Sequence, residues 1–315
     1  MPQPLPRKGI QTRKEMILLK RLRKEGAFHL MLLPCLVLLI IFAYLPMYGI
    51  RIAFQDFIPA KGMFGEQTWV GLDNFRYIFS MPDTINIFRN TLVIAIGKII
   101  GLIIVPVFAA IVLSDIRNSA LQRVAQTIIS FPHFISWVIM SAILTRTLSS
   151  SGIVNMLITA IGLPPVNFLT SNQIFPYTMI FTEIWKEFGF SSIIYLAAIT
   201  SIDPALYEAA RVDGANRFQL SFHITLPSIT PIIVLMCMLS LGNVLNAGFD
   251  QIFNMQNSLV MDWGDIIDTF VYRIGLVNFK YGISTAMGLF KSVISFGLIS
   301  GSYFLAYKFA DYRVF

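Results

Sequence analysis

The sequence predicts an all-α membrane protein with six transmembrane helices and both termini in the cytoplasm. The 315 residues are 56% hydrophobic and only 13% charged, whereas a soluble domain carries about 25% charge. The apolar residues gather into runs of about 20, the number that a helix needs to cross a bilayer. Basic residues crowd the beginning of the chain, and the positive-inside rule keeps such a segment in the cytoplasm.

Residues 1–28 are predicted to form a basic cytoplasmic segment. It carries Arg7, Lys8, Arg13, Lys14, Lys20, Arg21, Arg23 and Lys24. The net charge of +7 also suits a nucleic-acid binder, but an anionic inner leaflet explains these residues at least as well. We therefore expect membrane lipid as a partner and no nucleic acid. A signal peptide is the alternative, but the apolar run that follows is too long for one.

The remaining residues, 29–315, are predicted to form a single membrane domain. Its spans are expected at about 30–50, 91–113, 124–144, 174–199, 226–249 and 283–307. In the second span, the spacing of Gly97 and Gly101 lets another helix approach closely. His133 in the third span has no second histidine nearby and is more often a packing residue than a ligand, so we expect no metal. Cys35 and Cys237 lie in spans and do not indicate a disulfide framework.

The fourth predicted span is unusual because it carries three charged residues. Glu183, Lys186 and Glu187 are three or four positions apart, which places them on one helical face. Charged side chains at that depth in a membrane normally face the interior of a helix bundle or a water-filled pathway. One interpretation is a polar wall of a translocation pathway, to which the ring of Trp185 also contributes. The other is an internal Glu–Lys pair that only joins helices, and both remain open.

Two asparagines extend the candidate pathway to the fifth span. Asn243 and Asn246 lie near its predicted outer half, in a segment without charge. Their amides are able to hydrogen-bond across helices or to line a path. We therefore add both residues to the candidate pathway set.

A polar loop, residues 201–227, separates the fourth and fifth spans. Asp203 is a suitable N-cap with Pro204 at the first helical position, which predicts a short helix to Val212. Gly214 permits a turn that a bulkier residue resists. The following stretch, which contains Phe218 and Ile224, has a pattern that is ambiguous between helix and extended chain. Pro227 suits the first turn of the next helix.

The spacing within this loop resembles a known motif. Glu208-Ala209-Ala210, Gly214 and Ile224-x-Leu226-Pro227 match, at the expected distances, the EAA loop of permease subunits in binding-protein-dependent ABC importers. The resemblance implies a type I importer permease fold, also called MetI-like. It also implies that the loop couples the permease to an ATPase. The residues carried over as coupling residues are Glu208, Ala209, Ala210, Arg211, Asp213, Gly214, Ile224, Leu226 and Pro227.

The resemblance also implies the partners and the location. In this family a second permease stands beside the first, an ABC ATPase dimer binds beneath, and an extracytoplasmic solute-binding protein delivers the solute. The location is the bacterial cytoplasmic membrane. Further segments resemble the carbohydrate-uptake branch, and within it the oligosaccharide and polysaccharide subgroup. They are Pro46-Met47-Tyr48-Gly49, Phe131-Pro132-His133-Phe134 and Trp185-Lys186-Glu187.

The sequence does not predict an enzyme. It contains no GxxxxGK[ST] phosphate loop, so we expect no cofactor in this chain and place ATP and Mg²⁺ on the separate ATPase. An ion-gradient-driven carrier that uses Glu183 and Glu187 is the main alternative function. Against this alternative, the sequence shows no duplicated halves with matched broken helices. A carrier of this kind also leaves the coupling motif unexplained. A membrane component without a transport role is a further alternative, which the intramembrane charges and the coupling motif argue against.

Overall fold

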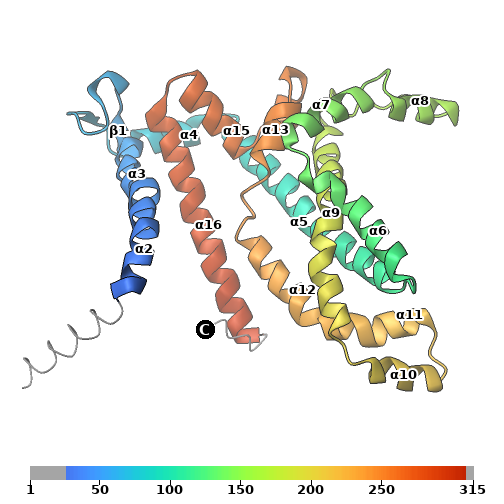
Figure 1. Cartoon of the computed structure of the whole chain (residues 1–315). Helices are drawn as coiled ribbons and strands as arrows, with labels where there is room; N and C mark the ends of the chain where they lie inside the picture. Colours follow the sequence, from blue (N-terminus) through green and yellow to red (C-terminus); the bar gives the residue numbers. More distant parts are fainter. Residues whose placement is uncertain (1–25, 310–315) are drawn as a thin grey trace, which may run out of the picture.

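The computed structural model describes residues 26–309, and most of them are helical. In this part of the chain, four helices are long and apolar enough to cross a membrane, or up to six if each of two bent helix pairs counts as one span. The helices lie side by side, with short helices and a small hairpin at one end and α10 and α11 at the other (Figure 1). The described chain begins and ends near the α10 end of the molecule (Figure 1).

The first span is continuous despite its prolines. It runs through α2 (Gly26–Leu39), η1 (Ile40–Tyr44), α3 (Leu45–Met47) and η2 (Tyr48–Phe54). Pro34 lies inside α2, and a π-helical turn precedes Pro46, a local adjustment that accommodates the missing amide. In its most apolar stretch no residue is buried. This span therefore stands apart from the rest of the chain along most of its length.

A small layer at the end of the molecule opposite α10 and α11 follows the first span. Strands β1 (Gln55–Asp56) and β2 (Thr68–Trp69) pair antiparallel around η3 (Pro59–Lys61), with Gln55 opposite Trp69. Helix α4 (Asp73–Ser80) then lies at the same end of the bundle, opposite α10 and α11. The side-chain amide of Asn74 donates to the backbone oxygens of Ala53 and Gln55, which fixes this layer to the end of the first span.

Helices α5 (Thr84–Ser114) and α9 (Phe175–Thr200) form the centre of the fold. Two glycines explain their close approach, because a Cβ at Gly97 would lie 2.4 Å from Ile180 and one at Gly101 would lie 2.0 Å from Ile184. The close-packing interpretation of the Gly97-x-x-x-Gly101 spacing is thus confirmed. By contrast, a Cβ at Gly297 or Gly301 would meet nothing within 4 Å among the described residues.

The third predicted span, 124–144, is not one straight helix and is corrected here. It consists of α6 (Ser119–Ser130), η4 (Phe131–Phe134) and α7 (Trp137–Thr147), with a bend of 100°. Pro132 has no amide hydrogen to continue the helix. Ser136 is extended and caps α7, its hydroxyl accepting from the amide of Ile139. Helix α8 (Ile153–Ala160) then runs along the end of the bundle opposite α10 and α11.

The fifth predicted span, 226–249, is displaced toward the N-terminus. Helix α10 (Pro204–Val212) turns by 72° from α9. A continuous helix then begins at Arg217 and runs through α11 (Arg217–Leu220), η5 (Ser221–Thr225) and α12 (Leu226–Leu241). The stretch before Pro227 is therefore helical, which resolves the ambiguity of its pattern. Residues 242–248 leave the helix, and Gly248 has a φ of 91° that a side-chain-bearing residue rarely adopts.

A series of short elements precedes the last long helix. These are α13 (Phe249–Met255), η6 (Ser258–Val260), α14 (Met261–Gly264), α15 (Ile267–Tyr272) and η7 (Arg273–Val277), followed by α16 (Tyr281–Phe309). Helix α13 packs against α7 and α15. The largest buried side chains here include Ile252, Ile266 and Phe270. This packing holds α13 beside the middle of α9, where the charged residues lie.

Candidate functional site

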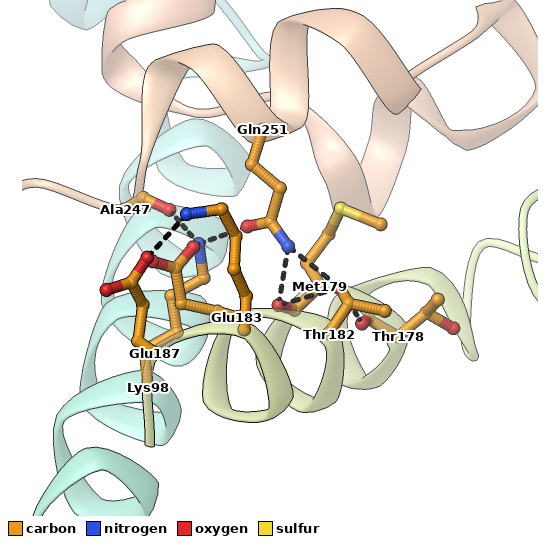
Figure 2. Close-up of polar contacts among 9 residues, drawn as sticks. Lys98, Thr178, Met179, Thr182, Glu183, Glu187, Ala247 and Gln251 are labelled. Atoms are coloured by element: carbon orange, nitrogen blue, oxygen red, sulfur yellow. Dashed lines mark hydrogen bonds and ion pairs between the residues drawn. The ribbon is translucent and has the colours of Figure 1, made fainter. Parts of the chain in front are cut away.

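The charge of Lys98 on α5 is satisfied by three acceptors from two other segments. Its ammonium donates to Glu183 Oε2 on α9 at 3.0 Å, to the carbonyl of Ala247 at 2.6 Å, and to Gln251 Oε1 on α13 (Figure 2). Lys98 is 6% exposed. An ammonium has three hydrogens to donate, so every donor is used. We call these four residues the central network.

Gln251 extends the central network along α9. Its amide nitrogen donates to the carbonyl of Met179 at 2.9 Å and to the hydroxyl of Thr182 at 2.8 Å (Figure 2). The side chain is fully buried. A buried amide without partners is costly, and here both its oxygen and its nitrogen are bonded. The central network therefore fixes the nonhelical segment 242–248 and the start of α13 against the α5–α9 pair.

A second cluster joins α9 to the broken third span. Lys186 Nζ lies 2.7 Å from Glu187 Oε1 and donates to the carbonyl of His133 at 3.0 Å. His133 Nδ1 lies 2.6 Å from Glu187 Oε2, and the imidazole stacks on Phe190 with ring centroids 3.9 Å apart. We call His133, Lys186 and Glu187 the histidine cluster. It satisfies carbonyl and carboxylate groups at the break between α6 and α7.

The histidine cluster is consistent with the packing interpretation of His133. The described residues contain no group of three or more histidine, cysteine or acidic side chains placed to hold a metal. Both glutamates of α9 have a lysine partner at hydrogen-bond distance. In this arrangement the charges of α9 join helices.

The candidate pathway residues separate into three environments. Glu183, Asn243 and Asn246 line one cavity of about 200 Å³ beside Lys98 and Gly248. Trp185 instead lines an apolar cavity of about 700 Å³, on the side of α9 that also presents Tyr177 and Phe181. The histidine-cluster members Lys186 and Glu187 lie outside both. The structure thus brings together three of the six predicted residues.

Two residues of this region escaped the sequence interpretation. Lys98 appears in the sequence as a lone charge in the second span, without an indication of its partner. Gln251 lies just beyond the predicted fifth span, in a segment expected to be an external loop. Gln251 lies close to Glu183 only because residues 242–248 leave the helix, so that both side chains bond Lys98. A glycine such as Gly248 after an apolar run is the one local signal that such a turn exists.

Helix α10 begins as the sequence predicts. The carboxylate of Asp203 accepts from the amide of Ala205 at 2.9 Å, and Pro204 occupies the first turn. Gly214 ends the helix with a φ of 85°. Asn216 and Gln219 then form a reciprocal capping box at 2.9 and 2.8 Å, which starts α11. Local sequence therefore determines both helices and the turn between them.

The predicted coupling residues are mostly exposed at this end of the molecule. Glu208, Ala209, Arg211 and Asp213 are exposed. Among the described residues, none of the three charged side chains here has an ion-pair partner within 4.0 Å. A groove of about 320 Å³ runs between α10 and α11, lined in part by Ala210, Asp213, Gly214 and Ile224.

Five coupling candidates do not line this groove, and two of them, Glu208 and Ala209, are exposed on α10. Arg211 lines a second hollow of about 340 Å³, next to Tyr207 and Asp115. Leu226 packs against the buried cluster around Ile229 and Tyr195. Pro227 is exposed in the first turn of α12. Leu226 and Pro227 therefore belong to the base of the loop.

Comparisons with known proteins agree with this architecture. Residues 102–306 match the family model described as binding-protein-dependent transport system inner membrane component. Protein LplB of Bacillus subtilis is 39% identical over 295 residues, covering 93% of this chain and 92% of LplB. The polygalacturonan/rhamnogalacturonan transport system permease protein YteP of the same organism is 38% identical, covering 95% and 93%.

A solved structure shows the same fold. It is the crystal structure of a bacterial ABC transporter involved in the import of the acidic polysaccharide alginate. Its matching chain is 36% identical to this one, with a TM-score of 0.85 over 93% of this chain and 99% of that chain. The family match covers well over half of the sequence, and the two relatives cover nearly all of it. The chain therefore belongs to the inner membrane components of binding-protein-dependent transport systems.

Proposed function

We propose that this chain is the permease subunit of an ATP-driven, binding-protein-dependent importer of an oligosaccharide derived from an acidic polysaccharide. The observation that carries the proposal is the exposed α10–α11 element, which stands at one end of a helical fold shared with an alginate importer. The relative whose name specifies polygalacturonan supports the same substrate class. Both named substrates are polymers of acidic sugars.

The coupling step is assigned to the loop 201–227. Glu208, Arg211 and Asp213 present charges without ion-pair partners in the described chain, as a surface does before it binds a complementary partner. The small side chains of Ala209 and Ala210 allow close approach to that partner. Docking of an ATPase against α10 transmits its closure to α9, because only the short turn between Thr200 and Pro204 separates the two helices.

The proposed topology has six spans and both termini in the cytoplasm. The spans are the helical run ending at Phe54, α5, the bent α6–α7 pair, α9, the run from α11 through α12, and α16. This count treats α10 as the docking element and α6–α7 as one broken span. The placement of both described ends near α10 supports it (Figure 1).

The remaining assembly is assigned to partners. ATP and Mg²⁺ bind a separate ATPase dimer, and this chain itself is no enzyme. A second homologous permease completes the pathway, and an extracytoplasmic binding protein delivers the oligosaccharide. A related alginate transporter was solved in complex with a periplasmic protein bound to an alginate pentasaccharide. Within this chain, Glu183, Asn243 and Asn246 are the proposed pathway residues.

Co-purification followed by reconstitution tests the proposal. The tagged chain is purified in mild detergent, its partners are identified by mass spectrometry, and the assembly is placed in proteoliposomes. We expect a second permease and an ATPase to co-purify. ATP should then drive uptake of an oligogalacturonide or an alginate oligosaccharide in the presence of the binding protein. Recovery of this chain alone, with uptake driven by an ion gradient, contradicts the proposal.

Cysteine labelling tests the topology separately. Met81→Cys should react with an impermeant thiol reagent added outside, whereas Gln11→Cys and Val212→Cys should react only after the membrane is opened. Val212 is 88% exposed, so a failure to label it from outside reflects its side of the membrane. External labelling of Val212→Cys inverts the assignment.

A further inference from the structure

A cavity of about 400 Å³ with both polar and apolar lining lies at the opposite end of the molecule from the α10–α11 loop. It is formed where α7 ends, where the chain approaches α9, and where α13 ends. Its polar and aromatic lining includes Ser150, Asn167, Phe168, Thr170, Asn254 and Gln256. None of the described side chains that line it is charged.

The lining of this cavity matches the chemistry of a sugar chain. Hydroxyl and amide groups donate and accept hydrogen bonds as sugar hydroxyls do, and Phe168 supplies an apolar ring for a sugar's C–H face. The volume lies within the usual range for small-molecule sites, about 300–1,000 Å³. These features favour a polyhydroxylated ligand over an ionic or a purely apolar one.

Several of these polar groups are not used within the chain. The oxygen Oε1 of Gln256 is buried and has no hydrogen-bond partner among the described residues. The side chains of Asn167, Thr170 and Ser150 likewise make no hydrogen bond to any described residue. A buried acceptor without a partner is unfavourable, and a hydroxyl donor is the group that satisfies it. By contrast, the side chain of Asn257, which also lines the cavity, donates to the carbonyl of Leu169 and accepts from the amide of Leu259.

The position of the cavity relative to α13 suggests an extended ligand. Its residues Asn254 and Gln256 lie at the C-terminal end of α13. The cavity that contains Glu183, Asn243 and Asn246 lies at Gly248, the N-terminal end. A helix rises about 1.5 Å per residue, so the two cavities are about 10 Å apart along α13. One extended sugar chain is therefore able to reach both cavities.

We propose that the outer cavity is a saccharide subsite that binds an oligosaccharide before it reaches the Glu183 cavity. The proposal rests on the function proposed above and adds a site for the same substrate. Because its wall carries no charge, the subsite binds the hydroxyl faces of the sugar and not its carboxylate. It therefore does not discriminate acidic from neutral chains, and charge selection takes place elsewhere.

Protection of a single cysteine tests this subsite in the reconstituted transporter. Thr170→Cys is introduced with Cys35→Ser and Cys237→Ser, and an impermeant maleimide is added outside. The probes are an oligogalacturonide, its carboxyl-reduced form and alginate pentasaccharide, each without binding protein. We expect the probes to slow labelling, with the reduced form as effective as the acidic one. Asn167→Leu or Gln256→Leu should raise the half-protective concentration roughly fivefold, the effect of one hydrogen bond.

Gln173→Leu is the matched control, because Gln173 is exposed, lies outside the cavity lining and loses the same amide. It should leave protection unchanged. Uptake of a probe without any protection by that probe overturns the subsite while the proposed function stands. Protection by the binding protein alone identifies a protein contact and also overturns it. Absence of uptake of both the oligogalacturonide and the alginate pentasaccharide contradicts the proposed function itself and removes the subsite with it.

Discussion

The charged side chains in the middle of α9 and those in the α10–α11 loop lie in opposite environments. In the middle of α9, both glutamates and Lys186 are bonded within the chain, and Lys98 has three acceptors. In the loop, Glu208, Arg211 and Asp213 are exposed and have no ion pair in the described chain. Both regions are rich in charge, so charge alone does not distinguish a structural role from a binding role.

The difference lies in where the partners are. A charge at membrane depth needs a partner in the fold, because hydrocarbon offers none. A charge at the membrane surface is hydrated and remains available to another protein. Substitutions of the paired charges around α9 should therefore reduce stability, whereas substitutions of Glu208, Arg211 or Asp213 should reduce transport with little effect on stability.

The largest expected effect is that of Lys98→Met. This change leaves the carboxylate of Glu183 without its cation and removes a donor from Ala247 and Gln251. Breaking a buried pair on one side costs about 3–5 kcal/mol. Thermal unfolding in detergent measures the loss, and the double variant Lys98→Met/Glu183→Gln should recover part of it. A single variant as stable as the parent refutes the central network as a structural element.

A smaller loss is expected for Gly189→Ala. A Cβ at this position on α9 would lie 2.0 Å from the carbonyl oxygen of Ile129 on α6. Backbone cannot rotate away as a side chain does, so the two helices must separate, at a cost of about 1–3 kcal/mol. Gly288→Ala on α16 is the control, since nothing lies within 4 Å of its Cβ. Equal melting temperatures for the two variants contradict the close contact.

Sequence predicts this fold best where one residue determines the local geometry. Asp203 with Pro204 starts α10, Gly214 ends it, and Gly97 with Gly101 admits α9. These effects require only the near neighbours or a helical spacing. For the same reason the helix and turn of the coupling motif follow the local sequence, although the motif extends into a helix that starts at Arg217.

The parts that escaped prediction depend on distant contacts. Pro132 is tolerated in straight membrane helices as well as in broken ones, so the 100° bend between α6 and α7 was not readable from it. The turn at 242–248 is stabilised by Lys98, about 150 residues away in sequence. Sequence likewise left the role of Glu183 open, and only the position of Gln251 shows that a lysine–amide network surrounds it.

The third prediction, Asp203→Ala, tests the local half of the comparison. The substitution removes the oxygen that accepts from the amide of Ala205, and the loss of such a cap costs about 1 kcal/mol. We expect faster hydrogen exchange of the α10 amides while α9 stays protected. Asp203→Asn keeps the acceptor and should exchange like the parent. Equal exchange in the alanine variant means that contacts other than the cap hold α10.

The smallest effect on stability is expected for Glu208→Lys, which changes an exposed side chain. We expect a change in unfolding free energy below about 0.5 kcal/mol. ATP-driven uptake should nevertheless fall about tenfold, because an opposite charge now faces the docked ATPase. Arg123→Glu, an exposed charge reversal on α6 outside the loop, controls for general surface charge and should leave uptake unchanged. Lys98 and Glu208 are thus separated by the same two measurements: loss of Lys98 acts through the fold, whereas loss of Glu208 acts through a partner. Unchanged uptake in Glu208→Lys means that Glu208 does not contact the ATPase. The charges of the loop and those around α9 then differ only in their burial.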